Sequence, residues 1–369
     1  MKCASLPAAT GASVAGRRRT MLQAGVFLLL GALGAGAFHA PAGAATTLTT
    51  AATATTAPDA QSWLVRASAA ARTASYSGIY VYTSAGIAET ARVTRLRTAN
   101  GDAERIESLD GARREVVRRG DEIHYFFVDS KTVRVDRRVS GRGFPDFLPQ
   151  DPSILAAHYA IEVGPVDRAA GRAVQVIRLR ARDASRYTQE IWVDHQSGLP
   201  VKRRVIDERG EIVEQFVFTE LSIGERVNPR HAMPSRRTGY AGWTVENTSV
   251  EEARTAGPGP VAQASVAAPP FPEPRMLPPG FRKLTQVSRM LPGHDRPVMH
   301  TVYSDGIATL SVFIDPDVTR VVGHEGVSQR GAVGVITRAA GDRAVITVGE
   351  LPPATLRKVA DSIGAVAAR

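Results

Sequence analysis

The pattern of hydrophobic positions changes from helical to strand spacing near residue 75. Apolar residues with the spacing of one helix face are Trp63, Ala67, Ala70, Ala71 and Ala74. Asp59 or Ser62 is suited to cap this helix, because a side-chain oxygen there accepts a hydrogen bond from the first turn. From Tyr76 to about Ile223 the apolar residues follow strand spacing. The sequence therefore predicts one helix followed by a long run of strands.

Four turn signals divide this run of strands. They are Asn100-Gly101, Arg119-Gly120-Asp121, Gln196-Ser197-Gly198 and Asp207-Glu208-Arg209-Gly210. The last has aspartate first and glycine fourth, as type I turns prefer, and it joins strands expected at 201–206 and 211–221. Because helical segments do not alternate with the strands, we expect an antiparallel meander and not a doubly wound α/β sheet.

Several of these strands are apolar on both faces. In the segment 123–128, Tyr125 and Phe127 belong to one face, whereas Phe126 and Val128 belong to the other. Both surfaces of such a sheet need to be covered. A curved sheet wrapped round helices, with room between them for an apolar ligand, satisfies this pattern, and so does an ordinary sandwich.

A second, smaller domain is predicted at 276–369. It follows a stretch rich in Pro, Gly, Ala and Arg at 225–275, which we interpret as an interdomain linker with Tyr240 and Trp243 as residues able to dock on a domain. The strands expected in this domain lie at 281–290, 297–303, 307–314, 331–338 and 343–348, with Ser304-Asp305-Gly306 as a strong hairpin signal. Pro352-Pro353 then begins a helix with one apolar stripe, so the domain is α+β.

The N-terminal segment has the features of an export signal. Three arginines at 17–19 precede an apolar run, and Ala42-Gly43-Ala44 supplies the small residues of a cleavage site, which predicts a signal peptide over 1–44. The arginine pair is compatible with general secretion and with the folded-protein route. An uncleaved anchor is the alternative, although glycines dilute the apolar run. The Thr/Ala-rich stretch 45–58 is expected to be disordered.

Charge and cysteine content narrow the compartment and the partners. The chain carries a formal charge of +10, and removal of the signal would lower it to about +6. Its single cysteine, Cys3, lies in the predicted signal, so the exported chain would form no disulfide and would depend on its buried core. An exported, mildly basic protein is a poor candidate for nucleic-acid binding.

The residues that carry chemistry do not form a catalytic or metal-binding motif. The histidines lack metal-ligand spacing, so no metal is expected, and neither a Walker loop nor a dinucleotide glycine fingerprint is visible. Asp194-His195 is the nearest approach to a hydrolase pair, but no Gly-x-Ser-x-Gly elbow accompanies it and His195 lies beside a turn signal. We therefore expect no enzyme activity and no cofactor.

A series of short motifs, in order along the chain, resembles the RseB/MucB family. The motifs in the first domain are Asp110-Gly111-Ala112-Arg113-Arg114-Glu115-Val116-Val117-Arg118-Arg119-Gly120, Arg182-Asp183, Arg186-Tyr187, Ile191-Trp192 with Asp194, Ser197 with Leu199-Pro200, and Glu214-Gln215-Phe216. Those in the second domain are Leu277-Pro278-Pro279-Gly280-Phe281, Tyr303-Ser304-Asp305-Gly306 and Gly349-Glu350-Leu351-Pro352-Pro353. The resemblance runs from about Trp63 to Ile363, and the linker departs from it most.

The resemblance implies a fold and a function. It implies that 59–224 is a lipid-sensing domain similar to LolA and LolB, a half-open curved antiparallel sheet, and that 276–369 helps to bind the periplasmic domain of an anti-sigma factor of the RseA/MucA type. Binding would shield that factor from its protease and so repress the envelope stress sigma factor. Lipopolysaccharide or lipoprotein acyl chains would relieve the repression.

Two sets of candidate residues follow from these expectations. The candidates for lining a lipid cavity are Tyr80, Tyr125, Phe127, Trp192, Phe216 and Phe218, and the candidates for contacting the protein partner are Arg113, Arg114, Arg119, Tyr303, Asp305 and Glu350. Solvated strand arginines are the alternative for the first three of the second set. A lipoprotein carrier without a regulatory partner is the alternative function, and self-association is left open.

Overall fold

The computed structural model describes residues 59–98, 101–119, 122–137, 145–224, 227–233, 240–248, 250–251, 272–289 and 294–364. Every structural statement below concerns these residues. The predicted signal peptide (1–44) and the predicted disordered stretch (45–58) lie outside them, as does most of the predicted linker.

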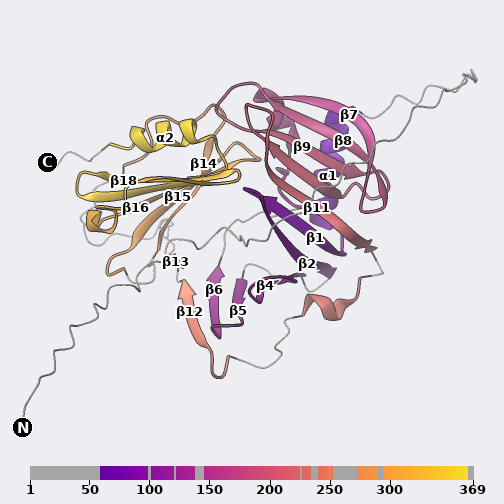
Figure 1. Cartoon of the computed structure of the whole chain (residues 1–369), viewed down its shortest axis with the longest axis horizontal. Helices are drawn as coiled ribbons and strands as arrows, with labels where there is room; N and C mark the ends of the chain where they lie inside the picture. The colour runs from indigo at the N-terminus through magenta and orange to yellow at the C-terminus, as the bar shows by residue number, and fades with distance from the viewer. Residues whose placement is uncertain are drawn as a thin grey trace, which may run out of the picture.

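The first domain is one large curved sheet of twelve strands (Figure 1). The strands are β1 (Tyr76–Ser84), β2 (Ile87–Thr98), β3 (Gly101–Ser108), β4 (Arg114–Arg119), β5 (Glu122–Phe127), β6 (Thr132–Arg137), β7 (Tyr159–Ala169), β8 (Arg172–Ala181), β9 (Thr188–Asp194), β10 (Pro200–Ile206), β11 (Ile212–Ile223) and β12 (Thr244–Thr248). Their spatial order is β12-β6-β5-β4-β3-β2-β1-β11-β10-β9-β8-β7, and all pairs except the parallel β12–β6 pair are antiparallel. The predicted meander is therefore confirmed, with the first and last halves of the run joined through β1 and β11.

Helix α1 (Ala60–Thr73) lies on one face of this sheet, which we call the inner face. Asp59 caps it, because its side chain accepts a hydrogen bond of 2.7 Å from the backbone N–H of Ser62. The buried cluster between the helix and strands β7, β8 and β9 includes Trp63, Leu64, Ala67, Tyr159, Ile177, Leu179, Ile191 and Val193. Burying each large apolar side chain of this kind stabilises the fold by about 1.5–3 kcal/mol.

The outer face at β4, β5 and β6 is covered by chain from the predicted linker. Phe126 and Val133 are buried there, with Tyr240 and Trp243 packed against them. The rings of Phe126 and Trp243 meet edge to face at 6.0 Å. The expectation that both faces of the Phe126 strand need cover is thus met on this side by two aromatic residues from outside the strand run.

The second domain is a seven-stranded antiparallel sheet with one helix. Its elements are β13 (Val250–Glu251), β14 (Arg282–Arg289), β15 (Val298–Ser304), β16 (Thr309–Asp315), β17 (Gly326–Arg330), β18 (Val333–Ala340), β19 (Arg343–Gly349) and α2 (Pro353–Ser362), in the sheet order β13-β14-β15-β16-β19-β18-β17. Helix α2 lies across one face of this sheet (Figure 1). Leu356 and Val359 from the predicted apolar stripe are buried there.

The predicted fold class, a large curved open sheet with a smaller α+β domain, is confirmed. Two details differ from the sequence-based expectation. Strands β12 and β13 arise inside the range predicted as a linker and join one sheet each. Strand β17 was not predicted, because Gly326–Arg330 has no apolar alternation and is almost wholly exposed. Neither described helix has the length and apolar character needed to cross a membrane.

Candidate binding face and domain interface

Three of the predicted lipid-contacting residues form one aromatic group on the inner face. The rings of Tyr80 and Phe216 stack at 4.2 Å, and Phe218 meets Phe216 edge to face at 5.7 Å. Phe218 lies over Gly78, where an added Cβ would be 2.8 Å from the phenylalanine ring and 2.5 Å from the carbonyl oxygen of Glu220. A glycine is therefore required in the middle of β1 for the ring to be buried.

The same face continues across β2 to β5. Strand register places Gly78 opposite Val93, Val93 opposite Ile106, Ile106 opposite Val116, and Val116 opposite Tyr125. Residues directly opposite in antiparallel strands share a face, and Phe127 lies two residues beyond Tyr125 on the same side. We call the set Tyr80, Ile106, Val116, Tyr125, Phe127, Phe216 and Phe218 the aromatic face. Phe218 is buried, and the other six are half-buried.

Trp192 does not join the aromatic face. It pairs with Lys202, which in turn pairs with Val217, and this register places its side chain on the opposite side of the sheet. The indole is only 4% exposed, and its Nε1–H donates to Asp167 at 2.7 Å. The cationic groups of Lys202 and Arg204 lie over the ring at 4.2 and 5.1 Å. Strand register thus places five of the six lipid candidates on one face and Trp192 on the other, although Trp192 belongs to the same buried hydrophobic cluster as Phe218.

A row of charged side chains closes one end of the aromatic face. Register places Tyr76, Arg95, Glu104 and Arg118 side by side on β1 to β4. Arg95 donates to the backbone oxygen of Ala71 at the end of α1, at 2.9 Å. Burial raises the pKa of Glu104, and the Arg95 and Arg118 guanidinium groups oppose that rise. This end of the sheet is therefore polar but internally paired.

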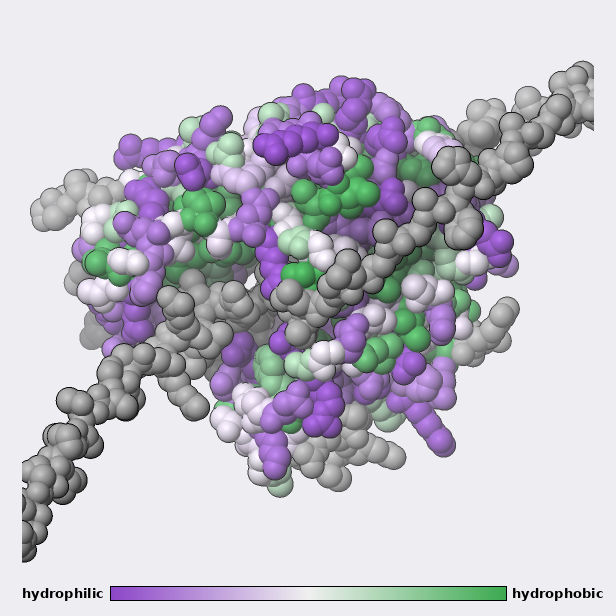
Figure 2. Space-filling model, in the orientation of Figure 1, coloured by the Kyte–Doolittle hydropathy of each residue, from purple (hydrophilic) through white to green (hydrophobic). Residues whose placement is uncertain are grey.

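An open hollow of about 580 Å³ lies near this end of the sheet. It is lined by Thr73, Ala74, Ser75, Leu96, Arg97, Ile223, Gly224, Val227 and Pro229. None of the six predicted lipid contacts lines it. Two of its lining residues, Ala74 and Ile223, pack against the hydrophobic cluster that includes Phe218. Figure 2 shows hydrophobic residues as separate patches on both domains.

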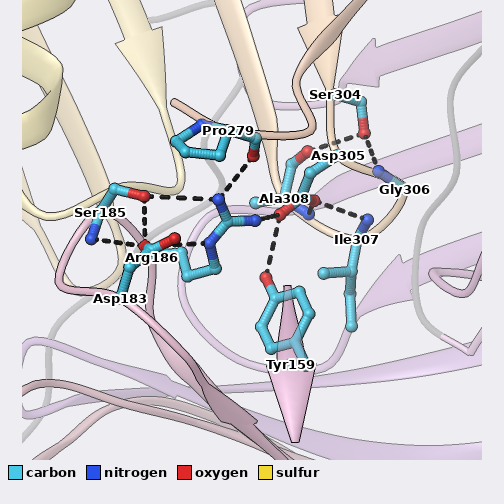
Figure 3. A network of polar contacts seen from close by, with 10 residues as sticks. All are labelled: Tyr159, Asp183, Ser185, Arg186, Pro279, Ser304, Asp305, Gly306, Ile307 and Ala308. Atoms are coloured by element: carbon cyan, nitrogen blue, oxygen red, sulfur yellow. Dashed lines mark hydrogen bonds and ion pairs between the residues drawn. The ribbon is translucent and has the colours of Figure 1, made fainter. Parts of the chain in front are cut away.

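A buried ion pair joins the two domains. Arg186, in the turn between β8 and β9, donates to the Asp305 carboxylate at 2.7 Å, and both side chains have no exposed surface. Tyr159 donates its hydroxyl to the same carboxylate at 3.1 Å, and Arg186 also donates to the backbone oxygen of Pro279 at 2.6 Å. Figure 3 shows these groups converging from the two domains. The other Asp305 oxygen accepts the backbone N–H groups of residues 307 and 308, which fixes the hairpin turn.

A second buried group, which we call the Arg203 cluster, lies elsewhere in the same interface. Arg203 of β10 donates to Gln189 at 2.9 Å and to Glu350 of the second domain at 3.3 Å. Its guanidinium also lies 3.9 Å from the carboxylate of Glu214 on β11, which accepts a hydrogen bond of 3.0 Å from the Tyr82 hydroxyl. Burial, reinforced by the charge of Glu350 and opposed by Arg203, raises the pKa of Glu214 to about 7.

The turn between β17 and β18 makes a third contact with the first domain. Ala332 is fully buried against Tyr187 and Val205, and Gln329 donates to the Tyr187 hydroxyl at 2.9 Å. Gly331 has a φ of 57°, and a Cβ there would overlap the Ser84 hydroxyl. A larger residue at 331 would therefore separate the domains at this point.

The predicted partner contacts have different positions in the structure. Arg113 is exposed and pairs with Asp129 at 3.0 Å, whereas Arg114 lies opposite Phe127, and the side chain of Arg119 is outside the described residues. The second-domain candidates do not form an open face. Tyr303 is 2% exposed in the core, and Asp305 and Glu350 contact the first domain. We therefore correct the prediction for Tyr303, Asp305 and Glu350, because their side chains contact other residues of this chain.

Sequence reasoning missed the interface role of Arg186 and Arg203. The sequence contained a local signal for a buried role of Arg203, because this residue lies between Val201 and Val205 on the buried face of β10. An arginine at an apolar position of an alternating strand needs a buried acceptor. No such signal exists for Arg186, because it lies in a turn and its partner is 119 residues away.

Comparison with known proteins places this architecture in a family. Residues 59–236 match the model described as the MucB/RseB N-terminal domain, and residues 273–364 match the model described as the MucB/RseB C-terminal domain. The chain belongs to the MucB/RseB family. The resemblance inferred from the short motifs is thus confirmed across both domains.

Relatives within the family are described as sigma factor regulators. The chain is 34% identical over 324 residues to the Pseudomonas aeruginosa sigma factor AlgU regulatory protein MucB, covering 84% of this chain and 92% of that one. It is 30% identical over 281 residues to the Escherichia coli sigma-E factor regulatory protein RseB, covering 74% and 81%. These descriptions are of regulatory proteins and name no enzyme activity.

Solved structures agree with this assignment. The crystal structure of MucB in complex with MucA(peri) has a TM-score of 0.61, with 30% identity over 84% of this chain and all of that one. A crystal structure of MucB alone has a TM-score of 0.57 and 27% identity, over 83% of this chain and 98% of that one.

Proposed function

We propose that this protein is an exported regulator that binds the periplasmic domain of a membrane anti-sigma factor of the RseA/MucA type. Binding protects that factor from regulated proteolysis and so represses the sigma-E stress response. The segment 1–44 acts as a cleavable signal that directs the chain to the periplasm. The observation that carries the proposal is that both domains match a family with a member solved in complex with MucA(peri).

The domain interface supports a single two-domain binding body. Its buried groups include one ion pair with no exposed side-chain surface and a second shared cation, both spanning the domains. A rigid arrangement of two sheets lets a partner contact both at once without first having to order them. Because Tyr303, Asp305 and Glu350 are internal, the partner surface of the second domain is formed by other residues.

We further propose that an acylated amphiphile, lipopolysaccharide or a lipoprotein acyl chain, relieves the repression by binding at the aromatic face. Each buried methylene of an acyl chain contributes about 0.8 kcal/mol, so half of a 14-carbon chain contributes roughly 5 kcal/mol before ordering costs. Releasing a protein partner requires a coupling of only about 1–3 kcal/mol. Half-buried aromatic side chains in contiguous rows provide the apolar surface that such a ligand needs.

A binding assay tests the anti-sigma assignment. The purified full chain is titrated with the periplasmic domain of the anti-sigma factor from its own host, and the complex is then challenged with the protease that initiates cleavage. We expect saturable binding and slower cleavage in the complex. An unrelated periplasmic domain of similar charge is the control, and equal binding to both domains would contradict the proposal.

A pair of phenylalanine variants tests the aromatic face. Phe216→Ala removes an aromatic ring from that face, and we expect acyl-chain binding to weaken about tenfold, in proportion to the apolar contact that is lost. Phe126→Ala is the matched control, because Phe126 lies on the outer face beneath Trp243. Binding is measured by displacement of a fluorescent fatty acid. Equal loss in both variants would place the ligand elsewhere.

A lipoprotein carrier is the second candidate, favoured by the aromatic face alone. A carrier needs no protein partner that is protected from proteolysis. Delivery of a lipoprotein to membranes without any binding to the anti-sigma domain would favour the carrier over the regulator.

A further inference from the structure

The Arg203 cluster holds more negative than positive groups. Glu214 and Glu350 both approach the single guanidinium of Arg203, and among the described residues no other cation contacts either carboxylate. The Tyr82 hydroxyl of β1 donates to Glu214, Ser84 of β1 lies directly opposite it, and the Gln189 amide of β9 accepts from Arg203. One cation shared by two carboxylates leaves an excess negative charge in a buried place, which is costly unless a proton neutralises it.

Charged residues outside the cluster do not neutralise the excess negative charge of Glu214 and Glu350. Glu89 on β2 lies directly opposite Tyr82, and the guanidinium groups of Arg114 and Arg330 act on Glu89. Arg114 and Arg330 therefore act on Glu89, which is not part of the Arg203 cluster. Burial and the Glu214 carboxylate raise the pKa of the Tyr82 hydroxyl, so Tyr82 stays a hydrogen-bond donor throughout the neutral range.

Docking of the second domain creates the imbalance. Arg203, Glu214, Gln189 and Tyr82 all belong to the first sheet, whereas Glu350 comes from the end of β19. Without the second domain, the Glu214 carboxylate no longer shares the Arg203 guanidinium with Glu350. With the second domain in place, Glu350 takes a share of the guanidinium and the site is closed.

We propose that the second domain docks with uptake of one proton at the Arg203 cluster, so that the closed arrangement of the two domains is favoured by mild acid and loosened by alkaline conditions. The proton resides on Glu214, hydrogen-bonded within the cluster, and leaves when the domains separate. The proposal goes beyond the regulatory function above and depends on neither the lipid nor the anti-sigma factor.

The expected size follows from proton linkage. The pKa of Glu214 is raised to about 7 in the docked arrangement. If it has its ordinary value in the separated state, as the proposal requires, the docked state binds more protons between these two values. The docking constant then falls as pH rises through that window. Between pH 6 and pH 8.5 the expected decrease is about tenfold.

Hydrogen–deuterium exchange of the full chain tests the proposal. The reporter is a peptide from the β17–β18 turn that contains Ala332, which is fully buried only while the domains are docked. Exchange is expressed as a protection factor, which removes the intrinsic pH dependence of the chemistry. We expect the factor to be about tenfold higher at pH 6 than at pH 8.5. A peptide from β9, in the first-domain core, is expected to change less than twofold.

Three variants sharpen the test. Glu214→Gln mimics the protonated side chain, so its protection factor is expected to stay near the acidic value at both pH values. Glu350→Gln removes the competing carboxylate and is expected to reduce the pH effect below threefold. Glu211→Gln, at an exposed position just before β11, is the control that keeps the full effect. A pH-independent factor in the unmodified chain, a tenfold effect retained by Glu214→Gln, or an equal change in the β9 peptide would each overturn the proposal.

Discussion

Two arginines join the domains of this protein, and their surroundings differ in charge balance. Arg186 pairs with Asp305 at 2.7 Å, where neither side chain has exposed surface, and with the partly exposed Asp183 at 3.2 Å. Asp305 is completed by a tyrosine hydroxyl and two backbone N–H groups. Arg203 is shared by Glu214 and Glu350, and Glu350 keeps 29% of its side chain exposed. The first site is balanced, because its buried carboxylate has a close cation and three further donors, and its second carboxylate, Asp183, keeps 36% of its side chain exposed. The second is unbalanced, and it adjoins the aromatic face because Tyr82 and Arg203 flank Phe216 on neighbouring strands.

One interface can therefore be both durable and adjustable. The Arg186 pair fixes where the second domain docks, since a buried charge without its partner is strongly disfavoured. The Arg203 cluster modulates the stability of the docked arrangement, because the gain or loss of one proton at its carboxylates changes the free energy of docking.

The largest expected effect is the loss of the balanced pair. Asp305→Ala leaves the buried Arg186 guanidinium with only the partly exposed Asp183 as counter-ion, removes the acceptor of Tyr159 and frees the Ser304–Ala308 turn, so we expect the free energy of unfolding to fall by about 3–5 kcal/mol. Urea unfolding at pH 7 measures this. Asp129→Ala removes the partner of exposed Arg113 and is expected to cost less than about 1 kcal/mol. Similar losses in the two variants would refute the distinction between buried and exposed pairs.

A smaller and pH-dependent effect is expected for the cation of the unbalanced site. Arg203→Met leaves Glu214 and Glu350 facing each other, and we expect a loss of about 2–3 kcal/mol at pH 8. Below pH 6 the loss is expected to shrink, since carboxylates without a cation take up protons. Urea unfolding of the variant and the unmodified chain at both pH values measures the difference. A loss that does not vary with pH would show that the carboxylates stay charged.

The smallest expected effect comes from removing the competing acid. Glu350→Gln keeps a hydrogen-bonding group beside Arg203 but removes one negative charge, so we expect a change of less than about 1 kcal/mol at pH 7. The variant is expected to lower the pKa of Glu214 towards its ordinary value, which carbon-13 NMR of labelled glutamate carboxyl groups measures. The sign is set by Glu350, whose charge raises that pKa. An unchanged Glu214 titration would show that burial alone causes the shift.

Much of the fold could be predicted from local patterns, and the domain interface could not. The Asp59 cap, the Ser304-Asp305-Gly306 hairpin and the stripe of α2 depend on neighbours a few residues apart, and all three were confirmed. The alternation in β5 likewise predicted two apolar faces. Strand β17 escaped prediction, because an exposed strand at the sheet edge carries no apolar period.

The failures concern contacts between distant parts of the chain. Asp305 was recognised as a turn residue, and its turn hydrogen bonds are present, but its second carboxylate oxygen meets a guanidinium 119 residues away. Trp192 was grouped with the lipid candidates as a large aromatic residue, and only the strand register revealed that it faces the other way. Composition identifies which side chains are able to bind lipid, whereas register decides which of them share a surface.

We propose that occupancy of the first domain by an acylated amphiphile and binding of the anti-sigma periplasmic domain oppose each other in the docked molecule. The direct measurement is a double titration of the full chain, in which the dissociation constant of each ligand is determined with and without a saturating amount of the other. We expect both constants to rise by the same factor, at least fivefold, because linkage requires the two effects to be equal. Two constants that do not change, or the absence of any binding to the anti-sigma domain, would contradict it.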